Sequence, residues 1–384
     1  MAKWDFTFDE FLRRRFAVQD AISAAGLDWI VLFHPVSIHW LTGWEGKSYQ
    51  AFQCLLVPKD GQPMVLIMRQ SEEAEAKAEA IFDELEPWGG CEPQDPLEVF
   101  ARVVRRFGLD RTKVGIEVPA YYLHPHHYVK VQNILGDALA GEFTNLVPDL
   151  KLVKSDREIS YIREAAKMAD DAMYNFQSEL AIGRTELELA GGIQHCLMRN
   201  GSGQAASTLN LVSGERTAFS HGAPTERRMM AGDFGNVEYG ATYKRYTSTI
   251  GRQFSLGAPS ARDAEIFAVV KAACEAAIAE MLPDTPAVRP HEKAKAIIAD
   301  AGLDKYRVHT SGYGLAPGFA PSWGEPLSMF GGCTYTLQAG MVITVEPPVF
   351  IGEEKTGARI IENVLITNDG PEVLSKFPRD LIVV

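Results

Sequence analysis

The sequence lacks the long apolar run that a membrane-spanning helix requires. None of its apolar stretches approaches the roughly 18 consecutive residues of such a segment. Its first residues, MAKWDFTFDEFLRRRF, are charged and amphipathic with no apolar core, so we expect no signal peptide. We therefore predict a cytoplasmic protein with no membrane partner.

Cysteine is scarce, and basic residues are outnumbered. The cysteines are widely scattered without any CxxC pair: Cys54, Cys91, Cys196, Cys274 and Cys333. This odd number at long spacings argues against a disulfide framework and against structural zinc. The 38 lysines and arginines face 50 aspartates and glutamates, giving a net charge of −12. Such a charge disfavours nucleic acid as a partner.

Hydrophobic periodicity predicts two domains in the 384 residues. Residues 1–148 alternate helical patterns with short β-rich runs such as DWIVLFH, which indicates a small α/β domain. Ser155 and Glu158 have the spacing of a capping box at the start of a long helix. Beyond them, helical patterns at 155–180, 185–199 and 261–281 are segregated from strand patterns such as 233–256. This segregation indicates an α+β domain over residues 149–384.

Several short segments, in their order and spacing, resemble the creatinase and prolidase family. They are HWLTGWEG at 39–46, LVKSDREISYIREAAKMAD at 152–170, HGAPTERRMMAGD at 221–233, HTSGYG at 309–314, GMVITVEPPVF at 340–350 and GARIIENVLITNDGPEVL at 357–374. The resemblance spans nearly the whole chain. It implies a creatinase-like N-terminal domain, a C-terminal domain of the pita-bread fold, and a homodimer.

The resemblance fails at the metal ligands. Metal-dependent members of the family hold two ions with two aspartates eleven residues apart, a histidine and two glutamates. The matching positions here carry Glu238, Thr249, either Tyr313 or Leu315, Glu346 and Ile361. Two divalent ions need several anionic oxygens and an imidazole. At most two of the five ligands remain, so we expect no metal and no other cofactor.

The finer resemblance is to a metal-free branch, with ectoine hydrolase the most similar. A neutral peptide carbonyl needs a Lewis acid for rapid hydrolysis, whereas an amidinium carbon already carries positive charge. We therefore predict a metal-independent hydrolase that cleaves a non-peptide C–N bond in a small zwitterionic cyclic amidine. The alternatives are creatinase-type guanidine hydrolysis, an Xaa-Pro metallopeptidase, and a pita-bread domain that binds without catalysis.

Three residues are predicted to be catalytic. Glu238 either attacks the substrate to form a covalent intermediate or acts as the general base on water. His221 matches the family's catalytic histidine by its spacing to Asp233, and imidazole suits a proton shuttle near neutral pH. Glu346 is predicted to be an acid of the same site, close to a cationic nitrogen of the substrate.

Six further residues are predicted to bind the substrate. They are Tyr313, Phe319 and Trp323 as an aromatic wall beside a cation, together with Arg359, Glu362 and Trp44. Arg359 either binds a substrate carboxylate or pairs with Glu346 or Glu362. Trp44 lies in the first domain, where it is expected to belong to a lid over the site of the partner subunit.

Overall fold

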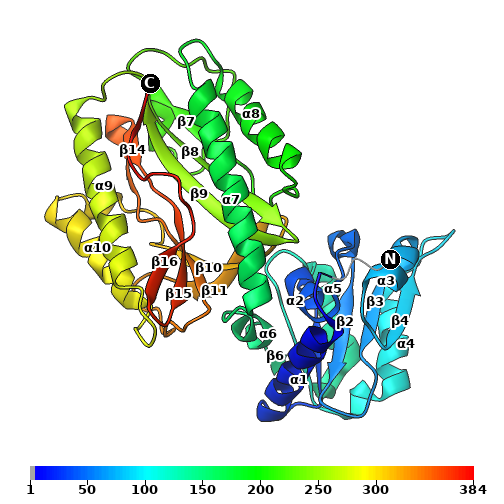
Figure 1. Cartoon of the computed structure of the whole chain (residues 1–384). Helices are drawn as coiled ribbons and strands as arrows, with labels where there is room; N and C mark the ends of the chain where they lie inside the picture. Colours follow the sequence, from blue (N-terminus) through cyan, green and yellow to red (C-terminus); the bar gives the residue numbers. More distant parts are fainter. Residues whose placement is uncertain (1–4) are drawn as a thin grey trace. The chain divides into compact units, whose positions relative to one another are not determined.

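The structure, a computed structural model, describes residues 5–384 and divides into two compact units. The first unit ends at Lys151 and the second is Leu152–Val384. Figure 1 colours them from blue to cyan and from green to red. The predicted class, a small α/β domain followed by an α+β domain, is confirmed.

The first unit is built on a mixed six-stranded sheet in the order β4-β3-β2-β1-β5-β6. Its strands are β1 (Trp29–Leu32), β2 (Cys54–Pro58), β3 (Val65–Arg69), β4 (Glu84–Trp88), β5 (Val114–Ile116) and β6 (Leu139–Glu142). Its helices are α1 (Phe8–Ala24), α2 (Pro35–Thr42), α3 (Glu73–Glu79), α4 (Pro96–Phe107), α5 (Pro125–Leu135) and α6 (Leu146–Leu150). Val31 and Ile30 point into separate apolar cores, so β1 is buried on both faces.

The second unit is built on a nine-stranded sheet whose main path is β16-β15-β12-β10-β9-β8-β7. The path strands are β7 (Asn210–Ser213), β8 (Phe234–Tyr243), β9 (Tyr246–Ser255), β10 (Tyr313–Phe319), β12 (Val342–Val345), β15 (Glu362–Thr367) and β16 (Gly370–Val373). Strand β11 (Ser322–Ser328) pairs with β10, and β17 (Ile382–Val383) pairs with β9. A separate two-stranded ribbon joins β13 (Val349–Ile351) and β14 (Thr356–Ala358).

Four long helices accompany this sheet: α7 (Asp156–Glu179), α8 (Glu186–Arg199), α9 (Ala261–Ala279) and α10 (Val288–Asp300). The predicted capping box of Ser155 and Glu158 starts α7, and Thr185 and Glu188 form another at α8. Among the described residues 5–384, no helix combines the length and apolar character needed to cross a membrane.

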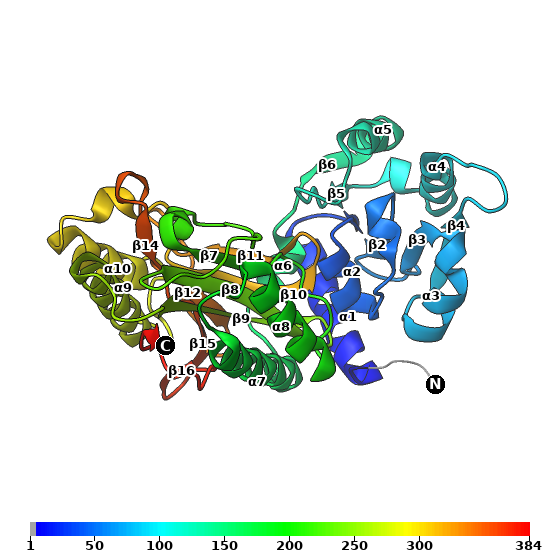
Figure 2. The same cartoon turned by 90° about the horizontal axis from the view of Figure 1, so that it is seen from above.

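The helices bury alternate side chains of the strands. On β8, Val237 and Tyr239 pack into the core beneath α7 and α8. On β12, Ile343 and Val345 pack into the core shared with α9 and α10. Figures 1 and 2 show α7 and α8 in green and α9 and α10 in yellow along the sheet. Because side chains of a strand alternate in direction, Glu238 points to the face away from α7 and α8.

Candidate active site

A cavity of about 290 Å³ opens on the polar face of the second unit. Strands β7, β8, β10 and β11 and the loop before β8 contribute its lining side chains. Among them are Asn210, His221, Glu238, Tyr313, Ser322 and Trp323. Four of the nine residues named from the sequence therefore line one pocket: Glu238, His221, Tyr313 and Trp323. Its volume lies just below the roughly 300–1,000 Å³ found for small-molecule sites.

Glu238 lies in the pocket as one half of a mostly buried ion pair. The β7–β8 register places Asn210 directly opposite, and its amide nitrogen donates to Glu238 Oε2 at 3.2 Å. The guanidinium of Arg359 pairs with the same oxygen and also donates to the carbonyl of Ser220 at 2.8 Å. The Arg359 side chain is 1% exposed and that of Glu238 is 9% exposed. Arg359 therefore places a fixed positive charge behind Glu238.

This pairing corrects the prediction for Arg359. Within residues 5–384, the Arg359 guanidinium forms its ion pair with Glu238 and with neither Glu346 nor Glu362, and it does not line the cavity. The backbone explains the difference. The Arg359 carbonyl accepts a hydrogen bond from the Asn236 side chain at 3.0 Å. This bond brings Arg359 beside β8, and therefore beside Glu238.

Two histidine rings meet at the edge of the pocket. His221 is exposed, and its ring lies edge-on to that of His309 with centroids 5.5 Å apart. Although the residue as a whole is exposed, partial desolvation of its ring, the charge of Arg359 and the neighbouring His309 lower the pKa of His221. Burial also lowers the pKa of His309, whose Nδ1 is 3.2 Å from the Thr310 carbonyl oxygen. Both rings are therefore neutral at pH 7, and His221 is suited to accept a proton.

Tyr313 and Trp323 form an aromatic wall of the cavity. The indole Nε1 of Trp323 donates to Tyr313 Oη at 3.0 Å, which leaves the phenol hydrogen available as a donor. Burial and nearby Glu346 raise the pKa of Tyr313 above its usual value, so the phenol stays neutral. A Cβ on Gly240 would lie 2.9 Å from the Trp323 ring, so glycine leaves the space that this wall occupies.

Glu346 lies near the pocket, but its carboxyl is fully buried. Burial raises the pKa of Glu346 to about 8, against a weaker opposing effect of its hydrogen bond with Thr344. Its Oε1 is 3.8 Å from His309 Nδ1, beyond hydrogen-bond distance, and has no hydrogen-bond partner among the described residues. Glu346 is therefore a neutral acid at pH 7.

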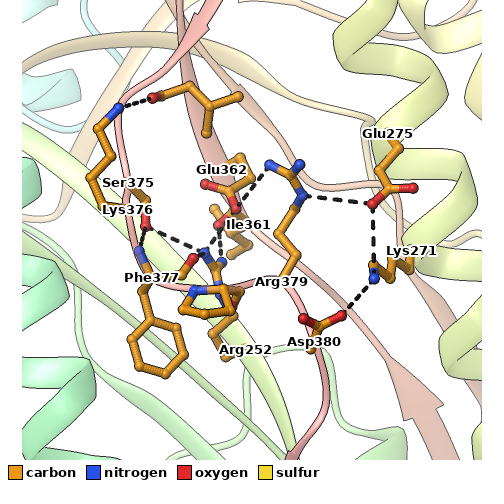
Figure 3. A network of polar contacts seen from close by, with 12 residues as sticks. Arg252, Lys271, Glu275, Ile361, Glu362, Ser375, Lys376, Phe377, Arg379 and Asp380 are labelled. Carbon is orange, nitrogen blue, oxygen red and sulfur yellow. Dashed lines mark hydrogen bonds and ion pairs between the residues drawn. The ribbon is translucent and has the colours of Figure 1, made fainter.

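Two predicted substrate-binding residues, Phe319 and Glu362, lie elsewhere in the second unit, and a third, Trp44, belongs to the first unit. Phe319 is buried beneath the guanidinium of Arg245, 4.5 Å from the ring centroid. Glu362 pairs with Arg252 at 2.8 Å and with Arg379 at 3.6 Å, as Figure 3 shows. Trp44 belongs to the first unit and donates to Gln53 at 3.1 Å. Neither Phe319 nor Glu362 lines the cavity, and the prediction that Trp44 belongs to a lid over the partner subunit's site stays a prediction.

The sequence reasoning missed Asn210 and His309. Asn210 reaches Glu238 only through the pairing of β7 with β8, across 28 residues of chain. His309 belongs to the HTSGYG segment used for the family resemblance. The segment could therefore have drawn attention to His309, but the contact between the His309 and His221 rings depends on tertiary structure.

Comparisons with known proteins give a consistent family. Residues 160–368 match the model of metallopeptidase family M24, and residues 14–159 match that of the creatinase/prolidase N-terminal domain. An uncharacterized peptidase of Bacillus subtilis, YqhT, is 27% identical over 93% of this chain and 96% of its own.

Solved structures agree with this family. The Xaa-Pro dipeptidase from Bacillus anthracis is 25% identical and has a TM-score of 0.82 over 97% of this chain and 100% of its own. The prolidase from Pyrococcus horikoshii is also 25% identical and has a TM-score of 0.83 over 96% of this chain and 99% of its own. The N-terminal creatinase-like domain and the C-terminal pita-bread domain predicted from the sequence are thereby confirmed.

These comparisons overturn the predicted reaction. The named relative and both solved structures are peptidases, so the assignment to hydrolysis of a non-peptide C–N bond in a cyclic amidine is wrong. That assignment rested on the missing ligands and on short stretches similar to ectoine hydrolase. Neither outweighs peptidase relatives that match almost the entire chain.

The family name implies metal ions, and the side chains at this site do not fit a pair of them. Within residues 5–384, no group of three or more histidine, cysteine, aspartate or glutamate side chains is arranged to hold an ion. Glu238 is paired with Arg359, whose charge would repel a cation. The Thr249 hydroxyl accepts from Asn363 at 2.8 Å, and Ile361 offers no donor atom. The donor set is too poor in oxygen and imidazole for two divalent ions.

Proposed function

Because this chain belongs to metallopeptidase family M24, we propose that it hydrolyses short peptides in the pocket around Glu238. The relevant substrates are dipeptides of the Xaa-Pro type, which the name of one solved structure describes. The observation that carries the proposal is the convergence of His221, Glu238, Asn210 and Tyr313 on one cavity. A cavity of about 290 Å³ suits a ligand of dipeptide size better than a protein chain.

The pocket offers a role for each of these groups. The Glu238 carboxylate, fixed by Asn210 and Arg359, orients the attacking water. Neutral His221 takes the proton of that water and returns it to the leaving nitrogen, a step worth about 10²–10⁴ in rate. The Tyr313 hydroxyl donates to the substrate carbonyl oxygen, where negative charge develops, and so takes the polarising role that a metal ion has in metallopeptidases. Removing one such donor typically costs about 10²–10³ in kcat.

A second function is favoured by the Arg359–Glu238 pair. A carboxylate already neutralised by a buried guanidinium is a weak base, while the aromatic wall of Tyr313 and Trp323 remains suited to binding. In this alternative the pocket holds a short peptide and leaves its bond intact.

A panel of Xaa-Pro and Xaa-Ala dipeptides separates the two functions. Chromatographic detection of both product amino acids, with and without added Mn²⁺, tests hydrolysis. Calorimetric titration with the same peptides tests binding. We expect release of free proline above the rate of a Glu238→Gln variant. Binding without release would favour the second function, and neither binding nor release would overturn both.

Three narrower predictions from the sequence stay predictions. A homodimer accords with the family resemblance, and sedimentation of the full chain tests it. Cytoplasmic location likewise rests on the sequence. Placement in a metal-free branch near ectoine hydrolase has no support from the peptidase relatives, and peptide hydrolysis does not depend on it.

A further inference from the structure

The loop that carries His221 runs from β7 to β8, over residues 214–233. Apart from a short 3₁₀ turn at Gly214–Ala218 and an isolated β-bridge between Arg228 and Thr185, it has no regular secondary structure. A loop of this kind has no strand or helix ladder to hold it, so its position depends on contacts with its neighbours. His221 lies near its middle and is exposed.

One buried carboxylate joins both arms of this loop. Glu186, the first residue of α8, is 0% exposed. It accepts hydrogen bonds from Ser213 Oγ at 2.8 Å, from the Thr225 backbone nitrogen at 2.9 Å and from Thr225 Oγ1 at 2.7 Å. It also pairs with the guanidinium of Arg216. Ser213 and Arg216 precede His221 in the chain, whereas Thr225 follows it.

Further bonds tighten the same junction. Arg216 donates to the Ala223 carbonyl at 2.6 Å, which closes the loop around His221. The first backbone nitrogens of α8 also donate into the loop, from Glu186 to the Arg227 carbonyl at 3.1 Å and from Leu187 to the Thr225 carbonyl at 3.0 Å. The start of α8 is therefore a docking point for the second arm.

The alternative is that Glu186 only stabilises its own helix, as acids in a first turn commonly do. That role already belongs to others, because Thr185 caps α8 and Glu188 completes the capping box. Glu188 is exposed and bonds the Thr185 nitrogen at 2.7 Å. The four groups that bond the Glu186 carboxylate, three side chains and the Thr225 backbone nitrogen, all lie outside the helix. Burying a carboxylate is costly unless it is hydrogen-bonded, and the loop supplies those bonds.

We propose that Glu186 is a positioning residue for His221, holding the loop 214–225 against α8 through Arg216 and Thr225. Its effect on catalysis rests on the proposed function above. Its effect on the loop does not. The carboxylate fixes the place of the imidazole relative to Glu238 without touching the substrate.

Hydrogen exchange measured by mass spectrometry tests the positioning itself. In Glu186→Gln we expect amides of 214–225 to exchange at least about 10-fold faster, because the charge-assisted bonds to the loop are weakened. Glu188→Ala breaks the capping box in the same turn and is the matched control. Glu362→Gln, another buried paired carboxylate of this unit, is a second control. Both controls should leave exchange in 214–225 unchanged.

Thr225→Ala keeps the test decisive if Glu186→Gln fails to fold, and it should accelerate the same amides by a smaller factor. A second readout is the ¹⁵N signal of the His221 ring in histidine-labelled protein, which should shift in Glu186→Gln and stay in place in both controls. The positioning role would be overturned if amides 214–225 exchange at the wild-type rate in Glu186→Gln, or if Glu188→Ala accelerates them equally. If no peptide is bound or hydrolysed but the loop exchange still responds, only the proposed function fails.

Discussion

Replacing Arg359 by methionine should destabilise the second unit strongly. The change leaves the Glu238 carboxylate nearly buried without its cation, and it also removes the bond to the Ser220 carbonyl. Breaking a buried pair in this way costs about 3–5 kcal/mol. Because Asn210 still donates to Glu238 and the carboxylate is partly hydrated, we expect the lower end, about 3 kcal/mol.

Urea unfolding followed by circular dichroism at pH 7 measures this cost. Adding Glu238→Gln to Arg359→Met removes the stranded charge, so the double variant should be more stable than Arg359→Met alone. Arg262→Met is the control, because Arg262 and its partner Glu354 are both more than a third exposed. If Arg359→Met costs no more than Arg262→Met, the buried pair does not exist as described.

Three further outcomes follow from the site. Because burial raises the pKa of Glu346 to about 8, the folded state holds a proton between pH 4.5 and 8 that the unfolded state releases. As the pH rises from 4.5 to 8, the free energy of unfolding of the wild type should therefore fall by on the order of a few kcal/mol more than that of Glu346→Gln. Urea unfolding at a series of pH values measures this difference. Gly240→Ala should displace Trp323 and weaken dipeptide binding in calorimetry, whereas Gly331→Ala, at an open position, should not. Calorimetric titration with Mn²⁺ should show no tight stoichiometric site, because Arg359 occupies the Glu238 carboxylate; two tightly bound ions would contradict that reading.

The fold was predictable because its signals are local. Ser155 and Glu158 mark the start of α7 by a spacing of three residues, and the structure places the capping box there. The hairpin of β8 and β9 falls within the strand pattern at 233–256. Alternation along β8 also predicts that Glu238 points away from Val237 and Tyr239, as the core beneath the helices requires.

The site was predicted only in part because its contacts are distant in sequence. The partner of Arg359 depends on the path of the chain past β8, so its nearest acids in sequence were the wrong choice. Asn210 enters through strand register, and Glu186 through the docking of a loop on α8. The reaction was mispredicted for a different reason. The absence of metal-ligand residues indicates whether the site can hold metal ions, but it does not identify the substrate.

The most direct test of peptide hydrolysis in this pocket compares turnover of one Xaa-Pro dipeptide by four proteins: wild type, Glu238→Gln, His221→Asn and Glu362→Gln. We predict a loss of at least about 10²-fold in kcat for the first two variants, which alter groups lining the cavity. Glu362→Gln, whose carboxylate pairs with Arg252 outside the cavity, should keep near wild-type turnover for the folded fraction. Equal turnover in Glu238→Gln and wild type would contradict the assignment of this pocket as the active site.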